Sequence, residues 1–178
     1  MPEAWKDKVP HVSETSSGKY WFVEDTKMKG SRVGWYGPGL NGGKRGDLMV
    51  EEGFTRGDLR CSDYKMRKAD QDRDGIETEV IYGILETDRS FVNKDALTMT
   101  YKAYNDWVSE WQTYDPTWLI PLGQLPNQSG IVAAEEMRRL PAIGIRGAEI
   151  SPATMTTPLW EDSWDPLWDA VESTGLPL

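Results

Sequence analysis

Glu149 combines a reactive side-chain type with a position that could place it in a substrate pocket. It lies in Gly147-Ala148-Glu149-Ile150, where it alternates with apolar residues near the end of a predicted strand. If Ala148 and Ile150 face covering helices, the two-residue period of a strand turns Glu149 to the opposite face. There its carboxylate would line a pocket. A solvated carboxylate at a strand end is an equally good interpretation, and both stay open.

Tyr82 and Gln124 occupy comparable positions on two other predicted strands. The candidate pocket residues are therefore Glu149, Tyr82 and Gln124, and the sequence alone identifies no catalytic residue.

Metal-ligand chemistry is limited by the composition, because the sequence has one histidine, His11, and one cysteine, Cys61. A single histidine cannot build a zinc site with two or three histidines. His11 lies between Pro10 and Val12 in an irregular segment, which favours a loop histidine. Cys61 has no histidine beside it in sequence, so a structural thiol is the better interpretation.

The segment Asp70-Gln71-Asp72-Arg73-Asp74-Gly75 matches the opening of a calcium-binding loop. Three carboxylates would surround the cation, and Gly75 would make the sharp turn. However, Ile81 stands where such a loop needs a bidentate glutamate, and a strand follows in place of the exit helix. We favour a charged helix end capped by Gly75, with a calcium-binding or structural module as the alternative.

From residue 62 onward, strand and helix patterns alternate. Apolar runs predict strands at 78–85, 119–126 and 143–150, and Leu176-Pro177-Leu178 resembles the opening of a fourth. Helices are expected over 62–72, 93–114, 129–140 and 164–174, the last with Ser163 as its N-cap and Gly175 as its C-terminal cap. Alternation of this kind implies parallel strands joined by right-handed crossovers. The expected fold class is α/β, a partial (β/α) barrel over 62–178.

Residues 1–61 are expected to form an irregular segment with a small β excursion. Tyr20-Trp21-Phe22-Val23 is a short β-type run, and Val33-Gly34-Trp35-Tyr36 is its expected partner across a turn near Lys29-Gly30.

The formal net charge of the 178-residue chain is -9, which disfavours nucleic acid and anionic membrane surfaces as partners. The sequence has no apolar run long enough to span a membrane and no apolar signal stretch at its start. A single cysteine favours a reducing compartment. The sequence therefore predicts a cytoplasmic protein.

Several ordered segments resemble the amidohydrolase-related family of metal-dependent hydrolases and decarboxylases. The resemblance covers about 62–178, and more loosely the chain from Val9 onward. The segments that carry it are Asp72–Tyr82, Ala103–Trp107, Asp115–Leu122, Leu125-Pro126, Ile145–Ile150, Trp164–Trp168 and Gly175–Pro177.

The resemblance implies a TIM-like barrel that acts on a small-molecule substrate. It also implies one divalent metal ion, most often zinc, that activates water for hydrolysis or polarises the substrate for non-oxidative decarboxylation. The family's metal-binding histidines match no position here, so no residue is assigned as a metal ligand. We therefore expect a fragment that covers the first half of such a barrel and is inactive alone. It would act in a homo-oligomer or with the missing half of the barrel, or as a split-barrel subunit that a partner chain completes.

Overall fold

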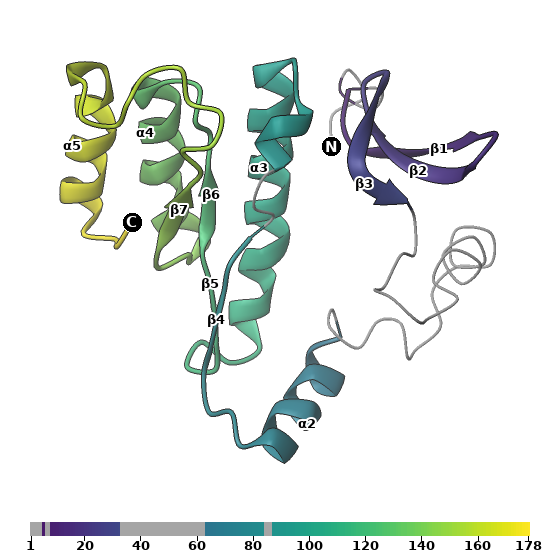
Figure 1. Cartoon of the computed structure of the whole chain (residues 1–178). Coiled ribbons are helices and arrows are strands. Elements are labelled where there is room, and N and C mark those ends of the chain that lie inside the picture. Colours follow the sequence, from purple (N-terminus) through teal and green to yellow (C-terminus); the bar gives the residue numbers. More distant parts are fainter. Residues whose placement is uncertain (1–4, 6–7, 33–62, 84–86) are drawn as a thin grey trace. The chain divides into compact units, whose positions relative to one another are not determined.

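The computed structural model describes residue 5 and residues 8–32, 63–83 and 87–178. The chain divides into two compact units, 1–75 and 76–178, and each is described by itself. Figure 1 labels their helices and strands.

The first unit contains an antiparallel sheet of three strands in the order β1 (His11–Thr15), β2 (Gly18–Val23) and β3 (Thr26–Arg32). The β2–β3 turn follows Val23, which pairs with Thr26. The turn predicted near Lys29-Gly30 is therefore wrong, because both residues lie inside β3. The expected partner strand at 33–36 lies outside the described residues.

Helix α2 (Tyr64–Asp74) completes the described part of the first unit. The side chain of Asp63 caps its start by accepting hydrogen bonds from the backbone N–H groups of Lys65 and Met66, both at 3.0 Å. Gly75 ends the helix with φ +75°, a left-handed conformation that glycine adopts without steric cost. The helix expected over 62–72 is confirmed.

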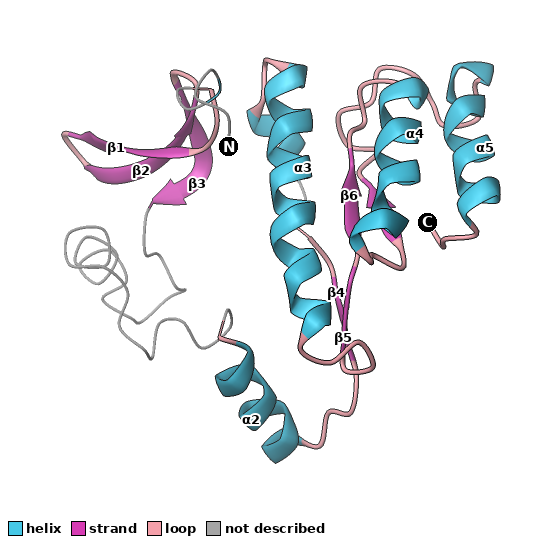
Figure 2. Ribbon diagram, turned by 180° about the vertical axis from the view of Figure 1, so that it is seen from behind, coloured by secondary structure: helices cyan, strands magenta, loops and turns pink. Residues whose placement is uncertain are grey.

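The second unit is built on short parallel strands. β4 (Glu79–Ile81) pairs with β5 (Leu119–Pro121), and β6 (Gly123–Leu125) pairs with β7 (Ala148–Ile150). Only Leu122 separates β5 from β6, and its N–H donates to the carbonyl of Ile81 at 2.9 Å. The segment 119–125 therefore runs beside β4 first and beside β7 afterwards. Figure 2 shows these strands from behind.

The segment 176–178, expected to begin a fourth strand, lies beside β7. The N–H of Ala148 donates to the carbonyl of Pro177 at 2.9 Å. The parallel direction predicted from the βα alternation is confirmed for β4–β5 and for β6–β7.

Three helices accompany these strands: α3 (Lys94–Ser109), α4 (Gly130–Arg139) and α5 (Asp165–Thr174). Short 3-10 turns, η3 (Glu110–Thr113) and η4 (Leu140–Ile143), extend the first two. The prediction that Ser163 caps α5 is wrong. Ser163 lies in another 3-10 turn, η5 (Asp162–Trp164), so the chain is already coiled there and Trp164 takes the cap position. Gly175, with φ +66°, ends α5 as predicted.

The main hydrophobic core joins the helices to β6 and β7. Its largest fully buried side chains come from segments between β6 and α5. They include Leu125, Met137, Leu140, Ile145, Trp164 and Leu167. Gly130 lets α4 start directly against the backbone before α5. A Cβ at this position would lie 2.8 Å from the Cα of Trp164. The two helices lie side by side in both views (Figures 1 and 2).

Candidate functional site

Gln124 and Glu149 lie on the face of the sheet opposite the helical core. Leu125 and Ala148 are buried in that core, so the alternation of a strand turns their neighbours Gln124 and Glu149 to the other face. Gln124 and Glu149 are also direct partners in the β6–β7 register. Glu149 therefore faces away from the helical core, and its role in a substrate pocket stays a prediction.

The carboxylate of Glu149 is held at one oxygen by two donors. Its Oε1 accepts hydrogen bonds from the backbone N–H of Gly83 and from the side-chain amide of Gln124. Gln124 and Glu149 are the middle residues of β6 and β7, and Gly83 follows β4, so the three residues are distant in sequence. Two of the three candidate residues thus meet one residue before the carboxyl ends of parallel strands, the side on which sites of α/β proteins form.

Gly83 is needed for this contact because the Gln124 side chain passes across it. A Cβ at Gly83 would lie 2.6 Å from the Cδ of Gln124, closer than carbon atoms pack. Sequence analysis missed Gly83, since a single glycine after a strand carries no signal of its own.

Tyr82 does not join Gln124 and Glu149 in this contact. It directly precedes Gly83, so in an extended backbone its side chain turns to the other face, and it is 64% exposed. Its predicted role in a substrate pocket stays a prediction.

Two tyrosines of α3 extend the polar surroundings of Glu149. Burial raises the pKa of Tyr104 to about 12, and the negative charge of Glu149 adds to this rise. Burial also raises the pKa of Tyr101, with further contributions from the charges of Asp88 and Glu149. Both phenols therefore remain neutral hydrogen-bond donors at neutral pH. Their helical spacing is that of core residues, so nothing in the sequence indicated that these two tyrosines lie near a candidate site.

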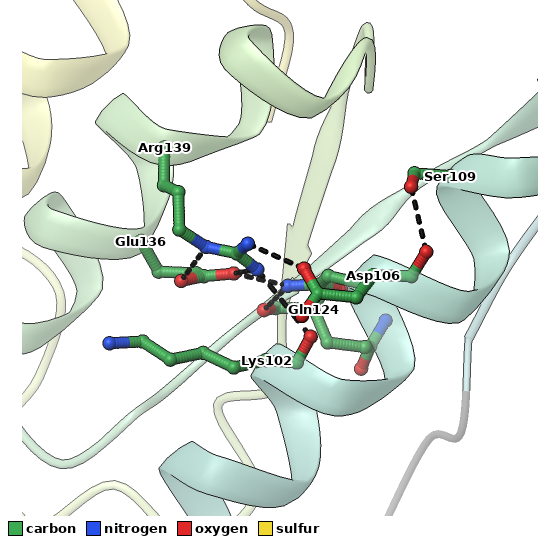
Figure 3. A network of polar contacts seen from close by, with 7 residues as sticks. Lys102, Asp106, Ser109, Gln124, Glu136 and Arg139 are labelled. Atoms are coloured by element: carbon green, nitrogen blue, oxygen red, sulfur yellow. Dashed lines mark hydrogen bonds and ion pairs between the residues drawn. The ribbon is translucent and has the colours of Figure 1, made fainter. Parts of the chain in front are cut away.

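A buried polar network positions Gln124 from the helix side (Figure 3). The fully buried Asn105 accepts from the backbone N–H of Gln124 at 2.7 Å and donates to its carbonyl at 3.0 Å. The same Asn105 amide donates to Glu136 Oε1 at 2.7 Å.

Arg139 connects the fully buried carboxylate of Glu136 to the surface. It donates to Glu136 Oε1 at 2.6 Å and to Oε2 at 2.9 Å, and it reaches Asp106 at 2.5 Å. These hydrogen bonds with the Glu136 and Asp106 side chains raise the pKa of Arg139. The buried acid of α4 is thus paired and hydrogen-bonded, as a buried charge must be.

The calcium-type motif forms a helix end. Asp70, Asp72 and Asp74 all lie on α2. Arg73 pairs with Asp70 at 3.3 Å and with Asp74 at 2.8 Å, and Lys68 pairs with Asp72. The interpretation that the sequence favoured, a charged helix end with Gly75 as its cap, is confirmed.

The described residues do not fit a catalytic metal ion. His11 Nδ1 lies 3.1 Å from the carbonyl oxygen of Val9, and its ring stacks on Phe22. Across 8–32, 63–83 and 87–178, no group of three or more His, Cys, Asp and Glu side chains could hold a metal. Cys61 lies outside the described residues.

Solved structures with similar folds include an amidohydrolase and decarboxylases. An amidohydrolase from Mycobacterium avium subsp. paratuberculosis K-10 has a TM-score of 0.75 at 16% identity, over 99% of this chain and 52% of that one. A 5-carboxyvanillate decarboxylase from Sphingomonas paucimobilis has a TM-score of 0.55 at 22% identity, over 62% of this chain and 33% of that one. A dihydroxybenzoic acid decarboxylase from Polaromonas sp. JS666, with bound manganese and 2-nitroresorcinol, has a TM-score of 0.54 at 23% identity, over 73% of this chain and 43% of that one.

The chain has the fold of these enzymes. The predicted resemblance to the amidohydrolase-related family is confirmed at the level of the fold. The chain spans between a third and about half of the length of these neighbours. No family model and no curated protein matches its sequence. Among the described residues, no helix is both long and apolar enough to cross a membrane.

Proposed function

We propose that this chain forms part of an amidohydrolase-related enzyme whose substrate is a small hydroxylated aromatic acid. In this proposal β4 to β7 are one arc of a (β/α) barrel, and the substrate binds at their carboxyl ends. One observation carries the proposal: Glu149 is held through a single oxygen by Gly83 and Gln124. A carboxylate fixed in this way directs its second oxygen to a ligand.

The chemistry of this arrangement favours a ligand that donates a hydrogen bond. An ionised carboxylate only accepts hydrogen bonds, so Glu149 suits a phenolic hydroxyl of the substrate. Like charges repel, so the substrate's own carboxylate would lie away from Glu149. Two of the structural neighbours are decarboxylases of dihydroxybenzoic acid and of 5-carboxyvanillate, so these two acids are the first candidate substrates.

The reaction is proposed as non-oxidative decarboxylation, with hydrolysis as the second possibility that the amidohydrolase neighbour favours. One neighbouring decarboxylase holds manganese. The described residues do not fit a divalent ion. A zinc ion in the whole enzyme stays a prediction. The prediction that this chain is inactive alone fails if the purified chain shows zinc- or manganese-dependent turnover.

Calorimetric titration with 2,6-dihydroxybenzoate, and with benzoate as the ligand without hydroxyls, tests the binding part of the proposal. The hydroxylated acid should bind more tightly. Glu149→Gln should weaken that binding about 10- to 150-fold, because a hydrogen bond to a charged group contributes roughly 1.5–3 kcal/mol. Glu172→Gln is the matched control, since Glu172 is exposed on α5. Equal affinities for the two acids, or an unchanged affinity in Glu149→Gln, would reject the proposal.

Association with further barrel strands, or with a second copy of the chain, also remains a proposal. Val80 and Tyr82 near the end of β4 are 47% and 64% exposed, which supports a partner on this strand. Size-exclusion chromatography should show an assembly larger than one chain. A stable monomer at micromolar concentration would count against it.

A further inference from the structure

A second polar cluster lies beyond the carboxyl ends of the same strands. Asp88 belongs to the 3-10 turn η2 (Thr87–Ser90) after β4, Asn127 follows β6, and Thr154 follows β7. Asp88 is fully buried and Asn127 is 3% exposed. Three loops that are distant in sequence therefore bring together a buried acid, a buried amide and the hydroxyl of the half-buried Thr154.

One oxygen of Asp88 is satisfied within the cluster. Its Oδ2 accepts hydrogen bonds from Asn127 Nδ2 at 2.8 Å and from Thr154 Oγ1 at 2.7 Å. Asn127 Nδ2 also donates to the carbonyl of Ser151 at 2.9 Å. These contacts fix the orientation of the carboxylate and of the amide.

The remaining side-chain oxygens of these two residues are not satisfied. Asp88 Oδ1 and Asn127 Oδ1 are buried and have no hydrogen-bond partner in the described structure. Both atoms can only accept. Since Asn127 donates directly to Asp88, the two free oxygens belong to adjacent groups. An unsatisfied buried acceptor is costly, so two neighbouring ones point to a bound donor or cation.

The negative charge of Asp88 favours a cation over a neutral donor as the bound ligand. In the described part of the chain, the side chains that donate to Asp88 are neutral, so its buried negative charge has no cationic partner. A water molecule would satisfy hydrogen bonds but leave that charge uncompensated, whereas a buried charge is normally paired. A divalent ion would carry twice the charge of the single carboxylate. One positive charge surrounded by oxygen ligands matches the site.

We propose that Asp88 and Asn127 bind a small monovalent cation, K⁺, Na⁺ or NH₄⁺, through their two free side-chain oxygens. The ion ties together the two loops that follow β4 and β6. The site is separate from the Glu149 contact and does not depend on the proposed enzymatic function. Tyr101 hydrogen-bonds the backbone of Asp88, and its pKa is raised by burial and by the charges of Asp88 and Glu149.

Thermal unfolding of the whole chain in chloride salts of K⁺, Na⁺, NH₄⁺ and choline at equal ionic strength tests the site. Choline is too large to reach the two buried oxygens of Asp88 and Asn127. A small cation that binds only the folded chain should raise the unfolding midpoint by about 3 °C or more for each tenfold excess over its Kd. Asp88→Asn should remove the difference between the salts, and Asp169→Asn, at an exposed position on α5, should preserve it.

Sodium NMR on the unmodified chain gives a second measurement, which does not depend on whether Asp88→Asn folds. Bound Na⁺ should broaden the sodium signal, and added K⁺ or NH₄⁺ should reverse the broadening by competition. The same midpoint in choline as in the three small cations, together with an unbroadened sodium signal, would overturn the proposal and leave a buried water as the occupant. Broadening that persists in Asp88→Asn would also overturn it.

Discussion

The side-chain amide of Asn105 pairs with both backbone polar groups of Gln124, as a neighbouring strand would. It accepts from the N–H at 2.7 Å and donates to the carbonyl at 3.0 Å. Asn105 therefore takes the place of a second strand partner for β6, whose described strand pairing is with β7. This contact holds Gln124 where its side chain can reach Glu149.

Asn105→Leu should destabilise the second unit by about 2–4 kcal/mol. The substitution leaves the buried N–H and carbonyl of Gln124 without partners and removes a donor to Glu136. Urea unfolding measures the loss, and amide hydrogen exchange at Gln124 should become faster. Lys102→Leu on the same helix is the control, because the Lys102 ammonium points away from the network in Figure 3. A control loss as large as that of Asn105→Leu would contradict the assignment.

Arg139→Met should cost about 3–5 kcal/mol, because it leaves the fully buried carboxylate of Glu136 without its cation. Replacing both partners, in Glu136→Leu with Arg139→Met, should cost less than the sum of the two single substitutions. A double-mutant cycle by urea unfolding measures this coupling. Purely additive losses would show that the pair does not act as a unit.

Gly83→Ala should reduce ligand affinity more than it reduces stability. The new Cβ meets the flexible Gln124 side chain, which can move aside but then leaves Glu149. We expect about 1 kcal/mol of lost stability, and weaker binding of 2,6-dihydroxybenzoate comparable to that of Glu149→Gln.

Gly123→Ala should show the opposite pattern. Its Cβ would lie 2.6 Å from the methyl groups of Leu140 in the core, so stability should fall by about 1–3 kcal/mol. Affinity should change little if the chain remains folded. Identical profiles for the two glycine variants, by calorimetry and urea unfolding, would argue against the separate roles.

The chain should lose stability in alkaline solution through Tyr104. Its pKa rises from 10.0 to about 12 on folding, so the folded state holds this proton more tightly than the unfolded state. The corresponding stability is complete below pH 10 and is lost as the pH rises through about 12. Tyr104→Phe should flatten this decline in urea-unfolding experiments, whereas Tyr114→Phe, at a half-exposed position, should leave it unchanged. A decline that Tyr104→Phe leaves intact would contradict the assignment.

The parallel strands and the helices of 62–178 could be predicted because their patterns are local. Gly75 and Gly175 marked helix ends for the same reason, since a left-handed cap is a property of one residue. The Lys29-Gly30 turn could not be placed correctly. A glycine in a short polar run favours a turn, whereas here pairing with β2 extends β3 through it.

The polar contacts of the candidate site were only partly predictable. Strand alternation identified the face of Glu149 and Gln124, but not that Gly83 would donate to the same carboxylate. Asn105 and Glu136 read as ordinary helix positions, because nothing local shows that one buried amide bridges α4 and β6. Asp88, Asn127 and Thr154 meet only after three loops have folded, so no sequence spacing could indicate them.

The absence of a side chain at Gly130 fixes how closely two helices can approach. A Cβ there would lie 2.8 Å from the Cα of Trp164, and main-chain atoms cannot move aside as a flexible side chain can. The short distance between α4 and the turn before α5 is therefore possible only because position 130 carries a hydrogen atom in place of a side chain. In laboratory evolution of this chain, substitutions could accumulate at the exposed positions of α4 and α5, while position 130 would tolerate no replacement unless both helices were rebuilt together.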